Sequence, residues 1–298
     1  MPSAESSNAL VRFGRNMASL FKIRISFMVT FSAAAGYLSR ASAVSIDLFF
    51  VLLGVMLLSF GAVTLNHIED ARIDRKMART AQRPIPAGRL SRSSAVFIAI
   101  ILLLLGAAAL TSIPGQETAL LALGACAVFW YNVVYFFMKR VSAFAAVPGA
   151  VIGALPPLMG WVGAGGAITD PFAVVIASFF FIWQIPHFWL LQITHTDDYR
   201  TAGLPTLAAT FRQDQLMRIT LVWIWATAAG GILLPMLAGT RMPFLVRIAM
   251  VLASAWLVAA SVKLLQTKSQ RPRPFMRSFK EINGYGLFMM LCLCLGIL

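Results

Sequence analysis

The sequence is poor in charged residues, and above all in acidic ones. Only 12% of its 298 residues are charged, and 11 Asp and Glu face 25 Lys and Arg. A soluble domain usually carries about 25% charged residues, so a surface exposed to water on all sides is excluded. The three cysteines, Cys126, Cys292 and Cys294, lie in apolar runs without a neighbouring His or Asp, which excludes a disulfide framework and a thiolate metal site.

Apolar residues take the place of the missing charge. They make up 59% of the chain, and a helix that spans a bilayer needs roughly 20 of them. The sequence therefore predicts an all-α, polytopic membrane protein: one domain, 1–298, formed by a bundle of nine transmembrane helices. The predicted spans lie near 21–38, 46–66, 94–113, 117–137, 143–162, 171–192, 216–237, 243–265 and 282–298.

The basic residues indicate how the bundle is oriented. With the N-terminus in the cytoplasm, only Arg40, Arg241 and Arg247 of the 25 Lys and Arg fall on the outer side. Basic residues concentrate in cytoplasmic loops, so we expect a cytoplasmic N-terminus and an outer C-terminus. The net charge of +14 then reflects the topology of the chain in the membrane. The sequence therefore predicts that the protein contacts membrane lipid and does not bind nucleic acid.

Topology does not explain where the few acidic residues lie. Five of the 11 gather at two cytoplasmic helix ends, with Glu69, Asp70 and Asp74 after the second span and Asp197 and Asp198 after the sixth. On a helix that continues past the membrane, Asn66, Asp70 and Asp74 are four residues apart and form one stripe of oxygen ligands. Such a stripe suits Mg²⁺, which takes oxygen ligands and commonly bridges to substrate phosphates.

A second interpretation of this stripe remains open at the level of sequence. The acids can instead belong to a solvated helix end and pair with Arg72, Arg75 and Lys76. The segment that follows is basic and rich in turns, because Pro84 and Pro86 end any helix near Arg83. A diphosphate site needs acidic residues that hold a divalent cation and basic residues that neutralise phosphate oxygens. The candidate basic residues are Arg79, Arg83, Lys139 and Arg140.

The sixth predicted span carries an unusual polar group near its cytoplasmic end. Gln184 and His187 share a helix face around Pro186, and polar side chains at this depth usually face the bundle interior or a cavity. His187 is equally compatible with an interhelical contact and with a ligand or acid–base role. In the fifth span, the small residues between Gly149 and Gly160 predict close helix packing or space for a large ligand.

These motifs resemble those of a known family. Asn66-x3-Asp70-x3-Asp74, with Met77-x-Arg79-Thr80-x2-Arg83-Pro84, is similar to the first aspartate motif of the UbiA superfamily of intramembrane prenyltransferases. Within it, the resemblance is greatest to the haem O synthase (protohaem IX farnesyltransferase) family. Four further motifs carry that likeness: Lys139-Arg140, Gly153-Ala154-Leu155-Pro156-Pro157, Trp183-Gln184-x-Pro186-His187 and Asp198-Tyr199-x2-Ala202-Gly203-x-Pro205.

The resemblance implies an Mg²⁺-dependent enzyme that transfers farnesyl from farnesyl diphosphate to a vinyl group of haem b. It also implies a bacterial cytoplasmic (inner) membrane, with the active site on the cytoplasmic side. It implies catalytic roles for Asn66, Asp70, Asp74 and Asp198, the three aspartates being metal ligands, and a later partner such as a haem A synthase or a terminal oxidase assembly. The residues expected to bind substrate are Arg24, Arg79, Arg83, Lys139, Arg140, Gln184 and His187. His187 is the candidate for contact with haem, as an iron ligand.

Some positions depart from the family's pattern, and other functions remain to be weighed. Arg72 stands where an acid is usual, His67 where the wider superfamily often has Asp, and Asp197 where a non-acidic residue is common. Tyr131 and Tyr135 receive no role. One alternative is a UbiA-type prenyltransferase with an aromatic or quinone-precursor acceptor, which has no evident need for His187. The other, a haem-handling transporter, predicts acids deep within the spans, where the sequence places none.

Overall fold

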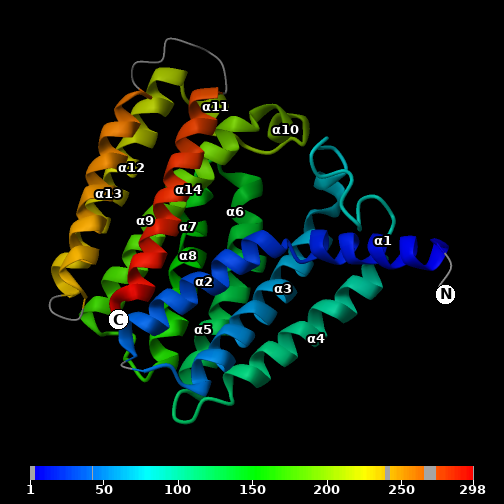
Figure 1. Cartoon of the computed structure of the whole chain (residues 1–298). Helices are drawn as coiled ribbons and strands as arrows, with labels where there is room; N and C mark the ends of the chain where they lie inside the picture. The colour runs from blue at the N-terminus through cyan, green and yellow to red at the C-terminus, as the bar shows by residue number, and fades with distance from the viewer. Residues whose placement is uncertain (1–3, 42, 239–241, 265–272, 298) are drawn as a thin grey trace.

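The computed structural model describes residues 4–41, 43–238, 242–264 and 273–297, and these form helices and connecting turns without a β-strand (Figure 1). The predicted span ends at Leu265 and Leu298, and the outer-side Arg241, lie outside the described residues. The elements are α1 (Ala4–Leu20), α2 (Ile23–Arg40), α3 (Ile46–Asp74), α4 (Arg92–Leu110), α5 (Glu117–Phe129), a π-helix η1 (Trp130–Tyr135), α6 (Phe136–Val141), α7 (Ala146–Gly149), α8 (Val151–Gly163), α9 (Pro171–Thr194), α10 (Thr196–Thr201), α11 (Leu207–Thr210), α12 (Gln213–Ala238), α13 (Phe244–Val262), α14 (Arg273–Cys294) and η3 (Leu295–Ile297).

The protein is an all-helical membrane protein with several spans. Among the described residues, seven segments are long and apolar enough to cross a bilayer: Ile46–Asp74, Arg92–Leu110, Glu117–Val141, Ala146–Gly163, Pro171–Thr194, Gln213–Ala238 and Phe244–Val262. An eighth is added if the bent pair Phe13–Leu20 and Ile23–Arg40 counts as one. The ninth predicted segment does not pass this test, because its helix, α14, begins at Arg273 and carries Arg277, Lys280 and Glu281 in its first half.

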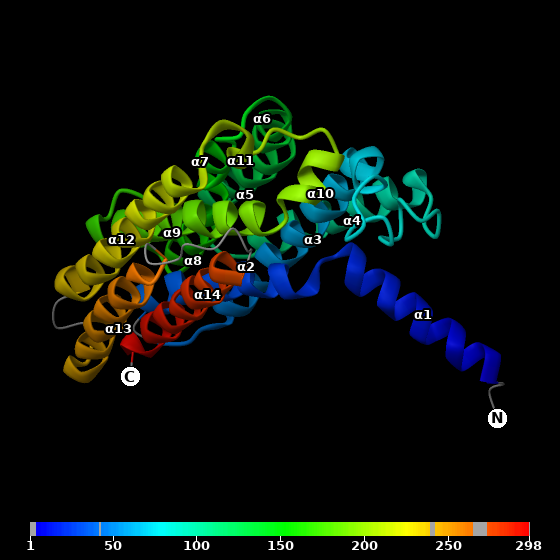
Figure 2. The ribbon, with the colours of Figure 1, turned by 90° about the horizontal axis from the view of Figure 1, so that it is seen from above.

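The first helix departs from the predicted layout. The first predicted span begins at residue 21, but a further helix, α1, precedes α2 and projects away from the bundle (Figure 2). Lys22 separates the two helices with φ 44°, a left-handed conformation that is uncommon outside glycine, and the axes bend there by 50°. This bend places the Lys22 side chain beside α3, which becomes important for the site.

Local sequence explains where the second span begins and how the polar connection after it ends. The Ser45 hydroxyl accepts a hydrogen bond from the Asp47 amide at 3.1 Å at the start of α3, and the Ser91 hydroxyl accepts one from the Ser94 amide at 3.0 Å at the start of α4. Both are N-caps that satisfy a free backbone donor. Between the helices, 75–90 forms successive turns, as the basic, proline-containing segment predicts.

The two larger of the four apolar clusters form the centre of the bundle, and both include residues of α2 and α8. In addition to these two helices, one cluster contains residues of α3, α4 and α5, and the other contains residues of α9, α12, α13 and α14. The last long helix, α14, packs against both α2 and α9, so the C-terminal end of the chain closes the bundle onto its beginning (Figure 1). Helices far apart in the sequence therefore line one common interior.

The contact between α2 and α8 depends on glycine. A Cβ at Gly160 would lie 1.9 Å from the Ala33 carbonyl oxygen, and one at Gly36 would lie 2.0 Å from the Pro157 carbonyl oxygen. These backbones approach too closely for any larger side chain, as small residues in membrane helices permit. The packing predicted for the small-residue stretch of the fifth span is confirmed.

Candidate active site

The acidic stripe lies on the last turns of α3, which continues to Asp74 as predicted. Asn66 and Asp74 are buried, and Asp70 is largely so, with a side chain 13% exposed. The Asn66 amide nitrogen donates a hydrogen bond to Asp70 Oδ2 at 3.0 Å. The stripe therefore faces the protein interior instead of solvent.

Asp70 is held by two cations from another helix. Lys139 Nζ contacts Asp70 Oδ2, and Arg140 Nη2 donates to Asp70 Oδ1 at 2.9 Å. Both cations lie on α6, where the guanidinium of Arg140 also packs 3.6 Å from the centre of the Phe136 ring. Because charge-assisted bonds of this kind are strong when shielded from water, they fix the C-terminal end of α6 against α3.

Asp74 has a separate cationic partner. Arg83 Nη1 donates to Asp74 Oδ2 at 2.7 Å, and the Asp74 side chain is only 2% exposed. The Thr80 hydroxyl donates to the Asp74 backbone carbonyl at 2.9 Å, which fastens the basic loop to the helix end. The alternative of a solvated helix end paired with Arg72, Arg75 and Lys76 is therefore wrong, because Lys139, Arg140 and Arg83 provide the partners.

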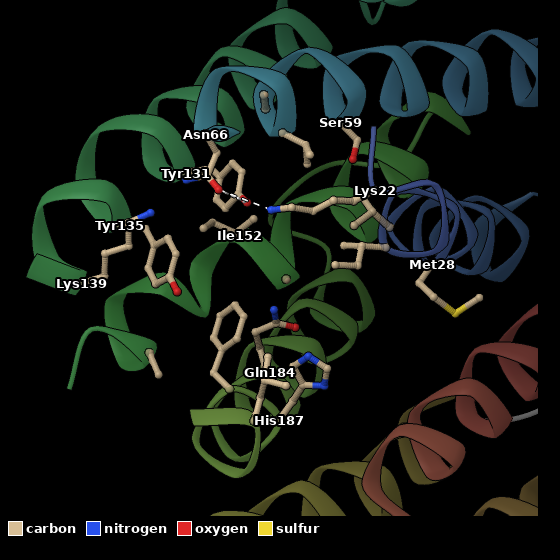
Figure 3. A pocket seen from close by; sticks show the side chains of 18 of the residues that line it. Lys22, Met28, Ser59, Asn66, Tyr131, Tyr135, Lys139, Ile152, Gln184 and His187 are labelled. Carbon is tan, nitrogen blue, oxygen red and sulfur yellow. Dashed lines mark hydrogen bonds between the residues drawn. The ribbon is translucent and has the colours of Figure 1, made fainter. Parts of the chain in front are cut away.

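Two further side chains meet at Asn66 (Figure 3). Lys22 Nζ donates to Asn66 Oδ1 at 3.4 Å, and the Tyr131 hydroxyl donates to the same oxygen at 3.3 Å. Sequence reasoning did not include either residue in the site. Lys22 was counted as a topology signal, and its approach to α3 depends on the bend between α1 and α2. Tyr131 carries a phenol inside a span, which is a signal that could have identified it.

The second acidic cluster makes no direct contact with the first among the described residues. Asp198 lies on α10, and its nearest basic partner is Arg79, with 3.8 Å between Arg79 Nε and Asp198 Oδ2. The neighbouring Tyr199 lines the same interior space as the stripe, and burial raises the pKa of its phenol, which keeps it protonated. Asp70, Asp74 and Asp198 do not converge into a group of three metal-type ligands, and none occurs elsewhere in the described chain.

The stripe opens into one large cavity between the helices. Its volume is about 880 Å³. Two acidic side chains, Asp70 and Asp74, line it together with six cationic ones: Lys22, Arg24, Arg79, Arg83, Lys139 and Lys280. Most of the remaining wall is apolar, so the cavity joins a polar end with excess positive charge to an apolar interior. This combination suits a ligand with an anionic head and a hydrocarbon tail.

Aromatic rings separate the polar end from the far wall. Tyr131 and Tyr135, both on the π-helix, stack with ring centres 6.0 Å apart, and Tyr135 stacks on Phe188 of α9 at 5.7 Å. A π-helix turn is rare in proteins, and those that occur are often found at functional sites. Both tyrosines line the same cavity, four residues apart on this short segment.

The far wall is formed by α9 and α14. Gln184 and His187 line the cavity on α9, as their shared face predicts (Figure 3). Gly153 of α8 leaves room for Gln184, because a Cβ there would lie 3.2 Å from Gln184 Oε1. From α14, Phe279, Lys280 and Asn283 also line the cavity. The sequence motifs gave no reason to place α14 at this site.

The structure thus gathers most of the predicted site residues around one cavity. Those that line it are Arg24, Asn66, Asp70, Asp74, Arg79, Arg83, Lys139, Gln184 and His187. Arg140 and Asp198 do not line it and act on it through Asp70 and Arg79. The polar lining residues that the sequence did not reveal include Lys22, Tyr131, Tyr135, Tyr199, Lys280 and Asn283.

These features belong to a polytopic helical membrane protein in which acidic and basic side chains cluster at one end of a largely apolar cavity. The UbiA prenyltransferase family profile matches residues 27–290. The chain is 37% identical over 277 residues to a protoheme IX farnesyltransferase of Geobacter sulfurreducens, covering 93% of this chain and 97% of that protein. It is 34% identical to a protoheme IX farnesyltransferase of Oleidesulfovibrio alaskensis, covering 94% and 95%.

A solved structure has the same fold. A UbiA homolog from Archaeoglobus fulgidus, described as bound to GPP and Mg²⁺, superposes with a TM-score of 0.64 at 14% identity, covering 93% of this chain and 99% of that one. The chain belongs to the UbiA prenyltransferase family.

Proposed function

We propose that this protein is a protohaem IX farnesyltransferase, a haem O synthase, which transfers a farnesyl group from farnesyl diphosphate to a vinyl group of haem b. The observation that carries the proposal is a cavity with two different ends. Asp70, Asp74 and the basic side chains around them line its polar end, and the rest of its wall is largely apolar and includes His187. The relatives named above, matched over nearly their whole length, support the same activity.

The residues at the polar end fit Mg²⁺. Their donor set is the carboxylates of Asp70 and Asp74 with the amide oxygen of Asn66, and Mg²⁺ is usually bound through one or two carboxylates together with substrate phosphates. Without substrate, the ion pairs of Asp74 with Arg83 and of Asp70 with Lys139 hold these two carboxylates in position. Asp198 would join the site beside Arg79. When bound, the metal would neutralise charge on the leaving diphosphate.

Basic side chains around the stripe would bind the diphosphate oxygens. Lys22, Arg83 and Lys139 approach it from three different elements, and each is shielded from bulk water, where charge-assisted bonds are stronger. Their charge stabilises the leaving group as the bond between the farnesyl carbon and the bridging oxygen breaks. That step gives diphosphate and an allylic cation.

The apolar part of the cavity would hold the farnesyl chain and protect the cation. Side chains such as Met28, Val55, Leu58 and Met159 line it and exclude water that would quench the intermediate. The π electrons of the haem vinyl group form the new carbon–carbon bond. Water then adds to the resulting cation and releases a proton, which leaves the hydroxyethylfarnesyl side chain.

The most direct test incubates the purified protein with haem b, farnesyl diphosphate and Mg²⁺. We expect a product with the mass of haem O, and its loss when EDTA removes the metal and its return when Mg²⁺ is restored. A quinone-precursor acceptor, such as 4-hydroxybenzoate, is the competing substrate. Prenylation of that compound with no haem product would establish the alternative enzyme, and no turnover of either would favour the transporter.

The basic residue that sequence reasoning missed provides a second prediction. Lys22→Met should raise the KM for farnesyl diphosphate by about tenfold, because one charge-assisted hydrogen bond contributes roughly 1.5–3 kcal/mol. Lys76→Met is the matched control, since Lys76 is exposed and does not line the cavity. Steady-state kinetics with varied farnesyl diphosphate measures the effect, and an equal response of the two variants would contradict the role of Lys22.

We also propose nine spans with a cytoplasmic N-terminus in a bacterial cytoplasmic membrane. The stretch of α14 from Ile282 onward is apolar and packs against α2, α9 and α13, so it supports a ninth crossing. The basic turns at 75–90 and the acidic stripe then lie together at the cytoplasmic face. A haem A synthase or a terminal oxidase assembly would take up the product there.

A further inference from the structure

One hydrogen-bonded pair on the far wall determines the chemistry of His187. Asn283 Oδ1 lies 2.8 Å from His187 Nδ1, and Asn283 Nδ2 donates to the Phe279 backbone carbonyl at 2.5 Å. A carbonyl oxygen can only accept, so the amide nitrogen of Asn283 must face Phe279 and the amide oxygen must face His187. The ring therefore carries its proton on Nδ1 and donates it to Asn283.

This arrangement leaves the lone pair on the other ring nitrogen. A neutral imidazole has one donor and one acceptor nitrogen, so His187 Nε2 is the acceptor. Among the described residues it has no hydrogen-bond partner, and it is not sealed from the cavity, unlike the ring nitrogens of His67. The ring lies beside Gln184 at the wall of the cavity (Figure 3).

The surroundings of His187 suit a flat, apolar ligand. The rings of Trp183, Phe279 and Phe188 surround the imidazole with centres 5.0, 5.2 and 5.7 Å away. Trp183 is itself fixed by a 2.9 Å hydrogen bond from its indole nitrogen to the Ile282 carbonyl. Lys280, one turn before Asn283, lines the same cavity and provides a cation for a carboxylate at the edge of such a ligand.

We propose that His187 Nε2 binds the iron of the acceptor porphyrin and that Asn283 is the positioning residue that fixes its tautomer. The inference rests on the proposed function, because it assigns the acceptor half of the same cavity. A histidine that binds a metal commonly donates its other ring proton to a carbonyl or carboxylate, which sets the ring's orientation and raises its basicity. Asn283 provides this acceptor from α14, at 96 residues' separation in the sequence.

The test adds haem b to the full-length protein in detergent, without farnesyl diphosphate. For the wild type we expect an iron–histidine stretching band in the resonance Raman spectrum of the ferrous complex. His187→Ala should lose the band and regain a nitrogen-ligated spectrum on addition of free imidazole. His195→Ala is the matched control, because His195 lies in the connection after α9 and does not line the cavity, and its spectrum should remain that of the wild type.

Asn283 is tested with two variants. Asn283→Leu removes the acceptor and should lower haem affinity by about 10-fold to 100-fold, the range typical for outer-shell partners of metal-binding histidines. Asn283→Asp keeps an acceptor and should retain ligation, with the iron–histidine band moved to higher frequency. Iron-free protoporphyrin IX should bind the wild type, His187→Ala and Asn283→Leu equally, because it fills the same space without a metal to ligate.

Two outcomes would overturn the inference: an unchanged iron–histidine band in His187→Ala, or equal losses of haem and protoporphyrin IX affinity in Asn283→Leu. A parallel assay for haem O separates this result from the proposed function. Wild-type protein that makes haem O without the histidine band refutes the ligand assignment alone. Protein that shows the band and makes no haem O refutes the proposed transferase and supports ligation.

Discussion

Asp74→Asn is expected to lower kcat by at least about 100-fold with little change in the shape of the site. The substitution keeps the size of the side chain and removes the charge that a metal and Arg83 both require. A bound metal contributes several kcal/mol of charge stabilisation, and each loss of about 1.4 kcal/mol slows a reaction tenfold. Haem O formation under saturating farnesyl diphosphate, haem b and Mg²⁺ measures the effect.

The control for Asp74 is another acid at a helix end. Asp214→Asn should keep full activity, because the Asp214 side chain is 45% exposed, does not line the cavity and pairs only with Arg212 in the described part of the chain. Loss of charge at Asp74 also leaves the Arg83 guanidinium without its partner, so thermal unfolding should be recorded for both variants. Adding Arg83→Met to Asp74→Asn removes that unpaired cation and should recover the melting temperature but not the activity. Full activity in Asp74→Asn would refute the metal assignment.

Gly160→Ala is expected to destabilise the bundle by about 3 kcal/mol or more, the upper end of what overpacking usually costs. The added methyl would lie 1.9 Å from the Ala33 carbonyl oxygen and 2.7 Å from the Tyr37 amide nitrogen. Both are backbone atoms of α2, so a rotamer change cannot relieve the clash and the two helices must separate. Thermal unfolding of the purified protein in detergent should show a marked fall in melting temperature.

A second helical glycine provides the comparison for Gly160. At Gly230 of α12 an added Cβ would meet Phe179 Cδ2 at 3.6 Å, an ordinary contact. Gly230→Ala should therefore leave the melting temperature unchanged or raise it, since alanine favours a helix over glycine by about 1 kcal/mol. Similar melting temperatures for the two variants would show that α2 and α8 are not constrained by their close approach.

Much of the candidate site could be predicted because it is local in the sequence. Asn66, Asp70 and Asp74 follow one another at helical spacing, and Gln184 and His187 share a face of one helix. The structure keeps both groups on single helices, α3 and α9. Helical periodicity alone determines which of these side chains face the same direction, so no knowledge of the tertiary arrangement was needed.

Other parts of the site could not be predicted, because they depend on which helices become neighbours. Lys22 reaches Asn66 across 44 positions, and Lys139 reaches Asp70 across 69. The acids therefore pair with distant cations, although Arg72 and Arg75 are nearer in sequence. The contact of Asn283 on α14 with His187 could not be predicted for the same reason, since no sequence motif connects the two residues. The α1 helix was missed because its polar composition carries no transmembrane signal.

The sequence alone was enough to predict a polytopic helical membrane protein, because 59% apolar residues in runs near bilayer length cannot be buried otherwise. It also determined which chemical groups the site contains, and their local spacing on α3 and α9. The folded arrangement of the helices was needed to show that Arg83, Lys139 and Arg140 pair with the acids. It was also needed to show that α14 supplies the partner of His187. Such pairings join residues far apart in the chain, and they are set by the close packing of helices that no local pattern encodes.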